Sequence, residues 1–247
     1  MIKTNSFTLA TYQKGNPDSK KLALVLPGKL DTKDYAHMRS HVDFLANLGF
    51  FALSFDPPGT WESPGDISLY TTTNYLKAID ELIEYFGNKP TFLVGHSRGG
   101  SMAMLAGMRN SKVLAFAAAM SYVYDKNYQG QAQNEEWKKK GYWESARDLP
   151  PGGGPKTKIF KLPYSFQEDQ KKYDMVEDIK KSKKPKLYIA GAHDQLVSAE
   201  KVREEFELAA DPKQFTLIHS VHDYRLEPIM INNVNMAIEH FLQEFWK

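Results

Sequence analysis

Short runs of almost continuous apolar residues alternate along this chain with longer segments in which apolar residues recur every three or four positions. The short runs cover residues 22–26, 50–55, 92–94, 113–120, 187–190 and 215–218, and each ends at a glycine, a proline or a polar turn. Runs of this length and apolarity are typical of parallel strands that are buried on both faces of a sheet. Residues 7–12 alternate more weakly, and we expect them to form an antiparallel strand at the sheet edge.

The segments between these runs have the periodicity of helices that bury one side. They cover residues 35–48, 72–86, 97–109, 199–208 and 228–245, and the first two are followed by Gly49 and Gly87, as helices often are. Alternation of strands and helices over most of the 247 residues predicts a single α/β domain spanning residues 1–247. We expect a doubly wound, mostly parallel sheet of eight strands with helices on both faces.

The segment 122–167 breaks this alternation. It has no clear period and contains Trp137, Trp143 and the proline–glycine run at residues 150–155. The segment is too long for a plain connection, and its aromatic content argues against disorder. We interpret it as a small insert that forms a lid over the strand ends, followed by a helix over residues 168–181 that returns the chain to the sheet.

Composition limits the classes of function. Hydrophobic residues make up 42% of the chain, enough for one sizeable core, and a net charge of +2 implies no strong field toward nucleic acid or a membrane surface. The absence of cysteine excludes disulfides, thiolate catalysis and cysteine-based metal sites. No apolar run has the length of a signal peptide or a membrane span. We expect a soluble cytoplasmic protein, and the oligomeric state stays open.

The run Gly95-His96-Ser97-Arg98-Gly99 lies between a predicted strand and a predicted helix. A serine at the tip of such a turn is exposed on a strained backbone, and the flanking glycines remove side chains that would collide. The pattern therefore predicts that Ser97 is the nucleophile of a serine hydrolase. The alternative is that Ser97 only caps a helix after a tight turn.

A serine hydroxyl needs a general base, and the base needs an acid to orient it. In a strand–turn–helix architecture the expected chain order is serine, then aspartate or glutamate, then histidine. Asp194 follows the apolar run 187–190 and is our candidate acid, with Asp125 as its main rival. His222 follows the last predicted strand and is our candidate base.

The anion of a tetrahedral intermediate needs backbone N–H donors. One should be the amide of Arg98, at the helix N-terminus, where the helix dipole also favours negative charge. The second should come from the loop after residues 22–26, and we place it on the amide of Lys29, with Leu30 as the alternative. We expect the side chains of Arg98 and Lys29 to face solvent or substrate.

With these residues in place, the chain resembles the α/β-hydrolase superfamily, in particular its small serine esterases and related lipase-like or aminopeptidase-like members. The motifs that carry the resemblance lie at residues 24–28, 55–63, 95–100, 191–194 and 221–223. Three positions depart from the usual pattern. Pro27 replaces the usual histidine of the oxyanion loop, Trp61 replaces a second glycine, and Val221 replaces the glycine before the catalytic histidine.

Together these features predict hydrolysis of a small-molecule carboxylic ester through an acyl-enzyme on Ser97, with no cofactor, no metal and no nucleic-acid partner. An ester is favoured because ester leaving groups ask least of a general acid. An amidase, peptidase or thioesterase with the same three residues is an alternative, as is a non-catalytic binding protein on the same fold. The residues that we expect to contact substrate, unless they only pack the insert onto the sheet, are Leu30, Trp61, Trp137 and Trp143.

Overall fold

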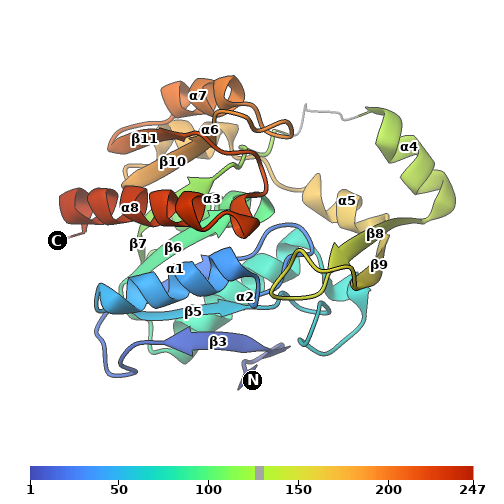
Figure 1. The fold of residues 1–247 in the computed structure, drawn as a ribbon, viewed down its shortest axis with the longest axis horizontal. Coiled ribbons are helices and arrows are strands. Elements are labelled where there is room, and N and C mark those ends of the chain that lie inside the picture. Colours follow the sequence, from blue (N-terminus) through green and yellow to red (C-terminus); the bar gives the residue numbers. More distant parts are fainter. Residues whose placement is uncertain (126–130, 247) are drawn as a thin grey trace.

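The computed structural model describes residues 1–125 and 131–246, and a seven-stranded sheet forms its centre (Figure 1). The strand order is β11-β10-β7-β6-β4-β5-β3. Every neighbouring pair is parallel except β3 and β5, which are antiparallel. The expected mostly parallel sheet is therefore confirmed. The strands are β3 (Thr11–Lys14), β4 (Leu22–Leu26), β5 (Phe51–Phe55), β6 (Thr91–His96), β7 (Val113–Ala119), β10 (Lys186–Gly191) and β11 (Lys213–Ile218).

Helices cover both faces of this sheet, as expected. One face carries α1 (Ala36–Asn47) and α8 (Pro228–Phe245), and the other carries α2 (Thr72–Tyr85), α3 (Arg98–Arg109) and α7 (Ala199–Leu208). Successive side chains of a strand point to opposite faces. In β4, Val25 therefore packs in the core with Val42 of α1 and Phe241 of α8, while Leu24 packs in the other core with Leu82 of α2.

The expectation of eight strands in the main sheet is wrong for the described residues, because the N-terminal edge is interrupted. The predicted strand over residues 7–12 is broken at Ala10, whose N–H donates to Ser63 Oγ at 2.9 Å instead of extending a ladder. The chain on one side of Ala10 forms β2 (Thr8–Leu9), which pairs with β1 (Ile2–Lys3) in a separate two-stranded sheet. Only the chain on the other side, β3, joins the main sheet.

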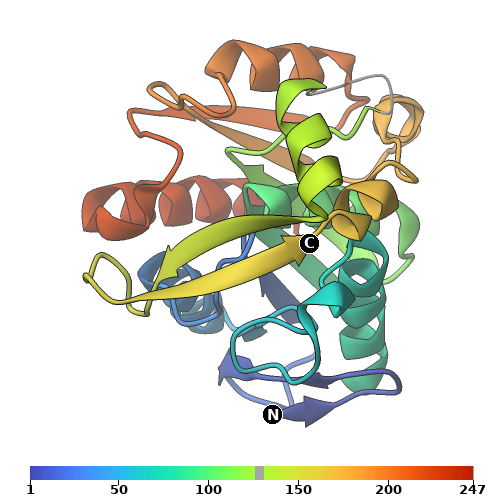
Figure 2. The same ribbon diagram turned by 90° about the vertical axis from the view of Figure 1, so that its right-hand side faces the viewer.

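The insert has regular structure that its sequence did not reveal. It contains α4 (Gln131–Lys140), an antiparallel hairpin of β8 (Tyr142–Asp148) and β9 (Thr157–Pro163), and the start of α5 (Ser165–Gln170). These elements lie together beyond one end of the sheet in Figure 1, and Figure 2 looks directly onto them. Part of the expected insert, residues 126–130, lies outside the described residues. A lid function for the insert stays a prediction.

The single helix expected over residues 168–181 is instead two short helices, α5 and α6 (Val176–Lys181). Between α5 and α6, two backbone N–H groups donate to acceptors outside a helix. The Val176 N–H donates to the Asp174 side chain at 3.0 Å, and the Met175 N–H donates to the Tyr124 carbonyl at 2.8 Å. A polar residue that accepts from a neighbouring N–H competes with the helix, which periodicity alone does not show.

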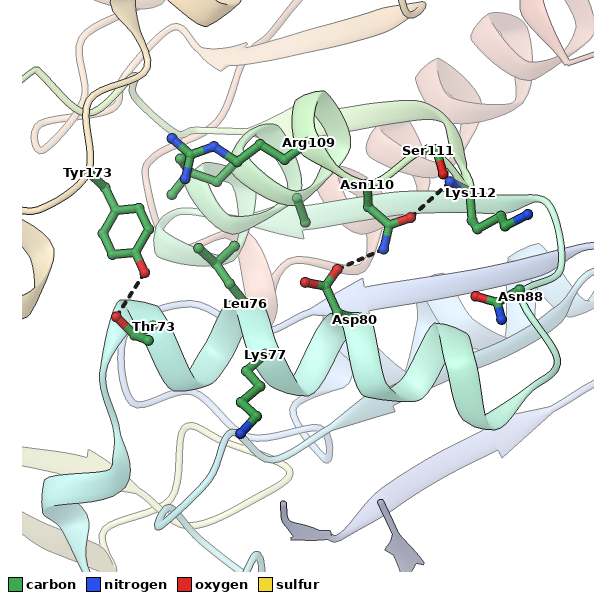
Figure 3. A pocket seen from close by; sticks show the side chains of 12 residues that line it. Thr73, Leu76, Lys77, Asp80, Asn88, Arg109, Asn110, Ser111, Lys112 and Tyr173 are labelled. Carbon is green, nitrogen blue, oxygen red and sulfur yellow. Dashed lines mark hydrogen bonds between the residues drawn. The ribbon is translucent and has the colours of Figure 1, made fainter. Parts of the chain in front are cut away.

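An open hollow lies on the outer side of α2 and α3 (Figure 3). Asn110 donates to Asp80 at 2.7 Å, and the hydroxyls of Thr73 and Tyr173 lie 2.8 Å apart. None of the candidate site residues lines this hollow. Within the described ranges, no helix combines the length and the apolarity that a membrane crossing requires.

Packing between α3 and β7 gives a stability prediction. A Cβ added to Gly107 would meet the ring of Phe116, and overpacking of this kind typically costs about 1–3 kcal/mol. We therefore expect Gly107→Ala to lower the free energy of unfolding, although alanine is the better helix former. In the matched control Gly154→Ala, an added Cβ has no neighbour within 4 Å. Urea unfolding followed by circular dichroism compares the two, and equal midpoints would contradict this packing.

Candidate active site

Ser97 lies at the sharp turn between β6 and α3, with φ of 52° and ψ of −124°. Non-glycine residues rarely adopt positive φ, so surrounding contacts must hold this backbone. A Cβ on Gly95 would collide with the backbone of Gly99, and one on Gly99 would collide with the carbonyl of Leu26. Both glycines of the motif are therefore needed for the turn to pack against β4.

The structure brings Ser97 together with His222 and Asp194. His222 Nε2 lies 2.9 Å from Ser97 Oγ, and His222 Nδ1 lies 2.8 Å from Asp194 Oδ2. In the tautomer with its proton on Nδ1, His222 donates to Asp194 and accepts from the Ser97 hydroxyl. This is the arrangement by which an imidazole removes a proton from a serine.

The Asp194 carboxylate is held in place on both sides. Its Oδ1 accepts from the backbone N–H groups of Leu196 and Val197, each at 2.8 Å. Burial favours the neutral acid, but the hydrogen bonds from His222 and from this backbone outweigh burial and hold the pKa of Asp194 below its usual value. Asp194 is therefore ionised beside the imidazole. The rival acid, Asp125, lies on an exposed position after β7, and the aspartate in contact with the His222 ring is Asp194.

The loop after β4 separates the two possible oxyanion donors. The Leu30 N–H donates to the Tyr70 hydroxyl at 3.1 Å, which occupies that amide. In the described ranges, the amides of Lys29 and Arg98 have no hydrogen-bond partner. The Leu30 amide is thus already occupied, and an oxyanion hole formed by the amides of Lys29 and Arg98 stays a prediction.

Asp56, directly after β5, holds the loop that follows β4 through hydrogen bonds. Its carboxylate accepts from the Thr32 hydroxyl at 2.7 Å and from the Lys33 N–H at 2.9 Å. Burial raises the pKa of Asp56, although the Lys33 ammonium, 3.4 Å away, opposes this shift. The motif at residues 55–63 thus positions the backbone that follows β4.

A second polar network lies behind His222, and sequence analysis missed it. His96 Nε2 lies 2.8 Å from the His222 carbonyl oxygen, which can only accept, so Nε2 carries the proton. His96 Nδ1 lies 3.6 Å from Asp31, and Asp31 in turn accepts from Arg147 of the β8–β9 hairpin. His96 and His222 are 126 positions apart, so no local pattern could reveal the contact.

The same network contains the one potential metal-ligand group found among the described residues. The donor atoms of Asp31, His37 and His96 all lie within 4.8 Å of one another, and all three residues are buried. These are ligand types that zinc accepts. Arg147 already pairs with Asp31, however, and its positive charge opposes a cation there. Burial, together with neighbouring His96, lowers the pKa of His37 well below its usual value, so its ring is neutral.

The residues expected to contact substrate lie between the insert and the sheet, and two of them are almost inaccessible. Leu30 is 1% exposed and Trp137 is 3% exposed, so the expectation that the Leu30 side chain is open to substrate is not supported. Trp61 and Trp143 are half-buried. The Trp61 indole donates to the Leu30 carbonyl at 2.9 Å, and the Trp137 ring stacks on Phe166 with centroids 5.9 Å apart. Packing of the insert is thus their visible role, and substrate contact stays a prediction.

The Arg98 side chain does not face solvent, which was one of the two placements expected for it. It is buried and donates to the Tyr124 hydroxyl, the Gln170 side chain and the Thr72 hydroxyl, each at 3.0 Å. The side chain is drawn inward because these oxygens, from α2, α5 and the segment that follows β7, surround it. Lys29 does remain exposed, as expected.

Comparison with known proteins agrees with this architecture. Residues 24–146 match the family model for the alpha/beta hydrolase fold. Palmitoyl-protein thioesterase ABHD10 of mouse mitochondria is 22% identical over 209 residues, covering 83% of this chain and 69% of that protein. Two solved structures are each 19% identical. Est1E of Butyrivibrio proteoclasticus with ferulic acid bound has a TM-score of 0.75, with 99% and 98% of the two chains covered. A monoacylglycerol lipase of Paleococcus ferrophilus has a TM-score of 0.73, with 96% and 99% covered.

At such identities the structural likeness concerns the fold alone. The family-model match covers the sheet from β4 to β7 with the serine turn between them. The sheet order and the hydrogen-bonded serine, histidine and aspartate agree with that match. The chain therefore belongs to the α/β-hydrolase superfamily.

Proposed function

We propose that this hydrolase cleaves carboxylic esters through an acyl-enzyme on Ser97. The observation that carries the proposal is the hydrogen-bonded series from Ser97 Oγ through the His222 imidazole to Asp194, with distances of 2.9 and 2.8 Å. A serine bonded in this way to an imidazole that a carboxylate orients has a base to remove its proton. The strained turn presents the hydroxyl, and His222 keeps 14% exposure through which a substrate can approach.

The proposed mechanism uses the same groups in both half-reactions. Ser97 Oγ attacks the ester carbonyl while His222 Nε2 takes its proton, and Asp194 stabilises the imidazolium that forms. The backbone N–H groups of Lys29 and Arg98 donate to the oxyanion. The intermediate collapses, the alkoxide leaves with the proton from His222, and the acyl group stays on Ser97. Water then attacks the acyl-enzyme carbonyl while His222 takes its proton. His222 returns the proton to Ser97 Oγ, and the carboxylic acid product leaves.

A thioester substrate is the second candidate, because the mouse relative is named as a palmitoyl-protein thioesterase. The same three residues serve either bond, since both reactions pass through an acyl-enzyme. An amide substrate and a non-catalytic binding role stay alternatives without a supporting observation. The cytoplasmic location also stays a prediction, and that relative is described as mitochondrial.

Replacement of the nucleophile tests the chemistry. We expect Ser97→Ala to lower kcat for p-nitrophenyl acetate by about 10⁴-fold or more, because no other group can carry the acyl intermediate. A fluorophosphonate probe should label the parent protein at Ser97 and leave the folded variant unlabelled. Turnover retained in the purified variant would rule out this mechanism.

The identity of the acid is tested by a matched pair of variants. Asp194→Asn keeps the shape but removes the charge that orients His222, so we expect kcat to fall by roughly 10³–10⁴-fold. Asp125→Asn makes the same chemical change at the rival position, and we expect kcat to change by less than about threefold. Initial rates with one ester measure both. The opposite ranking would transfer the role to Asp125.

Bond preference is tested with one acyl group on three leaving groups. We expect kcat/KM for a butyryl ester to exceed that of the butyryl anilide by more than about tenfold, because an amine leaving group demands more of the general acid. The butyryl thioester completes the set. A thioester kcat/KM above that of the ester would replace the proposed function with the second candidate.

A further inference from the structure

Two cationic side chains flank the nucleophile turn and share an aromatic neighbour. Arg98 follows Ser97 directly, and Lys29 lies on the loop that packs against the turn. The ring of Phe166 in α5 lies beside both charges, with Arg98 Cζ 4.3 Å and Lys29 Nζ 5.7 Å from its centroid. The insert therefore places a phenyl ring beside two positive side chains, those of the residues whose backbone N–H groups are the proposed oxyanion donors.

Among the described residues, the buried Arg98 charge has no acidic partner. All three of its hydrogen bonds go to neutral oxygens, those of Tyr124, Gln170 and Thr72, and its Nε has no hydrogen-bond partner in the described part of the chain. Buried guanidinium groups are normally paired with a carboxylate, because desolvation of an uncompensated charge is costly. The positive charge of Arg98 is thus not balanced locally.

Lys29 adds a second unbalanced charge, on an exposed side chain that lies beside two aromatic rings. Over residues 1–125 and 131–246, no carboxylate oxygen lies within 4.0 Å of its ammonium, which instead lies over Trp137 at 5.1 Å and Phe166. The side chain reaches solvent, yet desolvation, with repulsion from Arg98 and Arg147, lowers the pKa of Lys29 to about 8.

The neighbouring cation, Arg147, does not need a further partner, because Asp31 already balances it. The unbalanced charge is therefore local to Lys29 and Arg98, beside the serine. An anionic oxygen group bound at the exposed Lys29 ammonium would meet that charge directly and would also experience the field of Arg98, which shares the Phe166 ring with Lys29. Indole and phenyl faces around the ammonium would contact the carbon chain next to the anion and exclude water, which strengthens the attraction.

We propose that Lys29, backed by Arg98, forms a subsite for a carboxylate on the substrate, so that the preferred substrates are esters that carry a carboxylate near the scissile carbonyl. This inference rests on the proposed function, since it assigns the substrate class of the same site. The Lys29 side chain is then a specificity residue, separate from the role of its backbone N–H. The rings of Trp137 and Phe166 position the Lys29 ammonium and contact the carbon chain that joins the substrate carboxylate to the scissile ester.

Matched neutral and anionic esters test this subsite. One pair carries the charge on the acyl side, as p-nitrophenyl glutarate monoester against its methyl ester. The other carries it on the alcohol side, as 4-acetoxybenzoate against methyl 4-acetoxybenzoate. We expect kcat/KM to favour the anionic member of at least one pair by about tenfold or more. Lys29→Met should bring that ratio close to one, and Lys29→Glu should invert it.

Lys161→Met is the matched control. Lys161 is an exposed lysine of the hairpin that contacts Glu144 at 3.9 Å and the Tyr142 ring. Its replacement removes the same charge from a side chain that has different neighbours from those of Lys29. We expect this variant to keep the parental substrate ratio. A ratio near one in the parent protein for both pairs, or an equal loss of the ratio in the Lys161 variant, would overturn the subsite.

A binding measurement separates failure of the subsite from failure of the proposed function. In Ser97→Ala protein, saturation-transfer NMR compares glutarate monomethyl ester with dimethyl glutarate, neither of which can be turned over there. Tighter binding of the monoanion, lost on adding Lys29→Met, supports the subsite even if the parent hydrolyses no ester. Hydrolysis of neutral esters without any anion preference contradicts the subsite alone, and absence of both contradicts both.

Discussion

The backbone of Ser97, with φ of 52° and ψ of −124°, is a conformation that packing must impose, because isolated residues other than glycine avoid it. The contacts that impose this conformation come from β4 and from α3, the helix that begins directly after Ser97. Gly99 lies directly against the Leu26 carbonyl, and Gly95 lies against Gly99, so the turn fits only where the two neighbouring strands place it. The direction of the Ser97 hydroxyl, its distance from His222 and the position of the loop after β4 all depend on this one junction.

The insert is tied to this junction from two sides. On one side Arg98, the residue after the serine, donates to Gln170 of α5. On the other, Arg147 of the hairpin pairs with Asp31, which faces His96, and His96 holds the carbonyl of the proposed base. Movement of the insert would therefore change the charge environment on both sides of the serine. This coupling is the physical basis for expecting the insert to govern which substrates enter.

Much of the fold could be predicted from the sequence because parallel strands such as β4 and β6 are buried on both faces, and their centres are runs of apolar residues. The positions of Ser97, Asp194 and His222 followed because strand ends in this topology converge at one edge. The two predictions of secondary structure that were wrong, one for a strand and one for a helix, failed because of single polar contacts. The Ser63 hydroxyl captures the Ala10 N–H and splits the edge strand, and Asp174 interrupts the helix expected over residues 168–181. The role of His96 depends on a contact across 126 positions, which no local pattern encodes.

The central claim is that Ser97 carries an acyl group during turnover, and intact-mass analysis of acid-quenched protein tests it most directly. Mixing with a p-nitrophenyl ester and quenching within the first turnover should add one acyl mass, located on the peptide that contains Ser97. A burst of one equivalent of p-nitrophenol should accompany it. Hydrolysis without any acylated protein, or an acyl group on a different residue, would contradict the account.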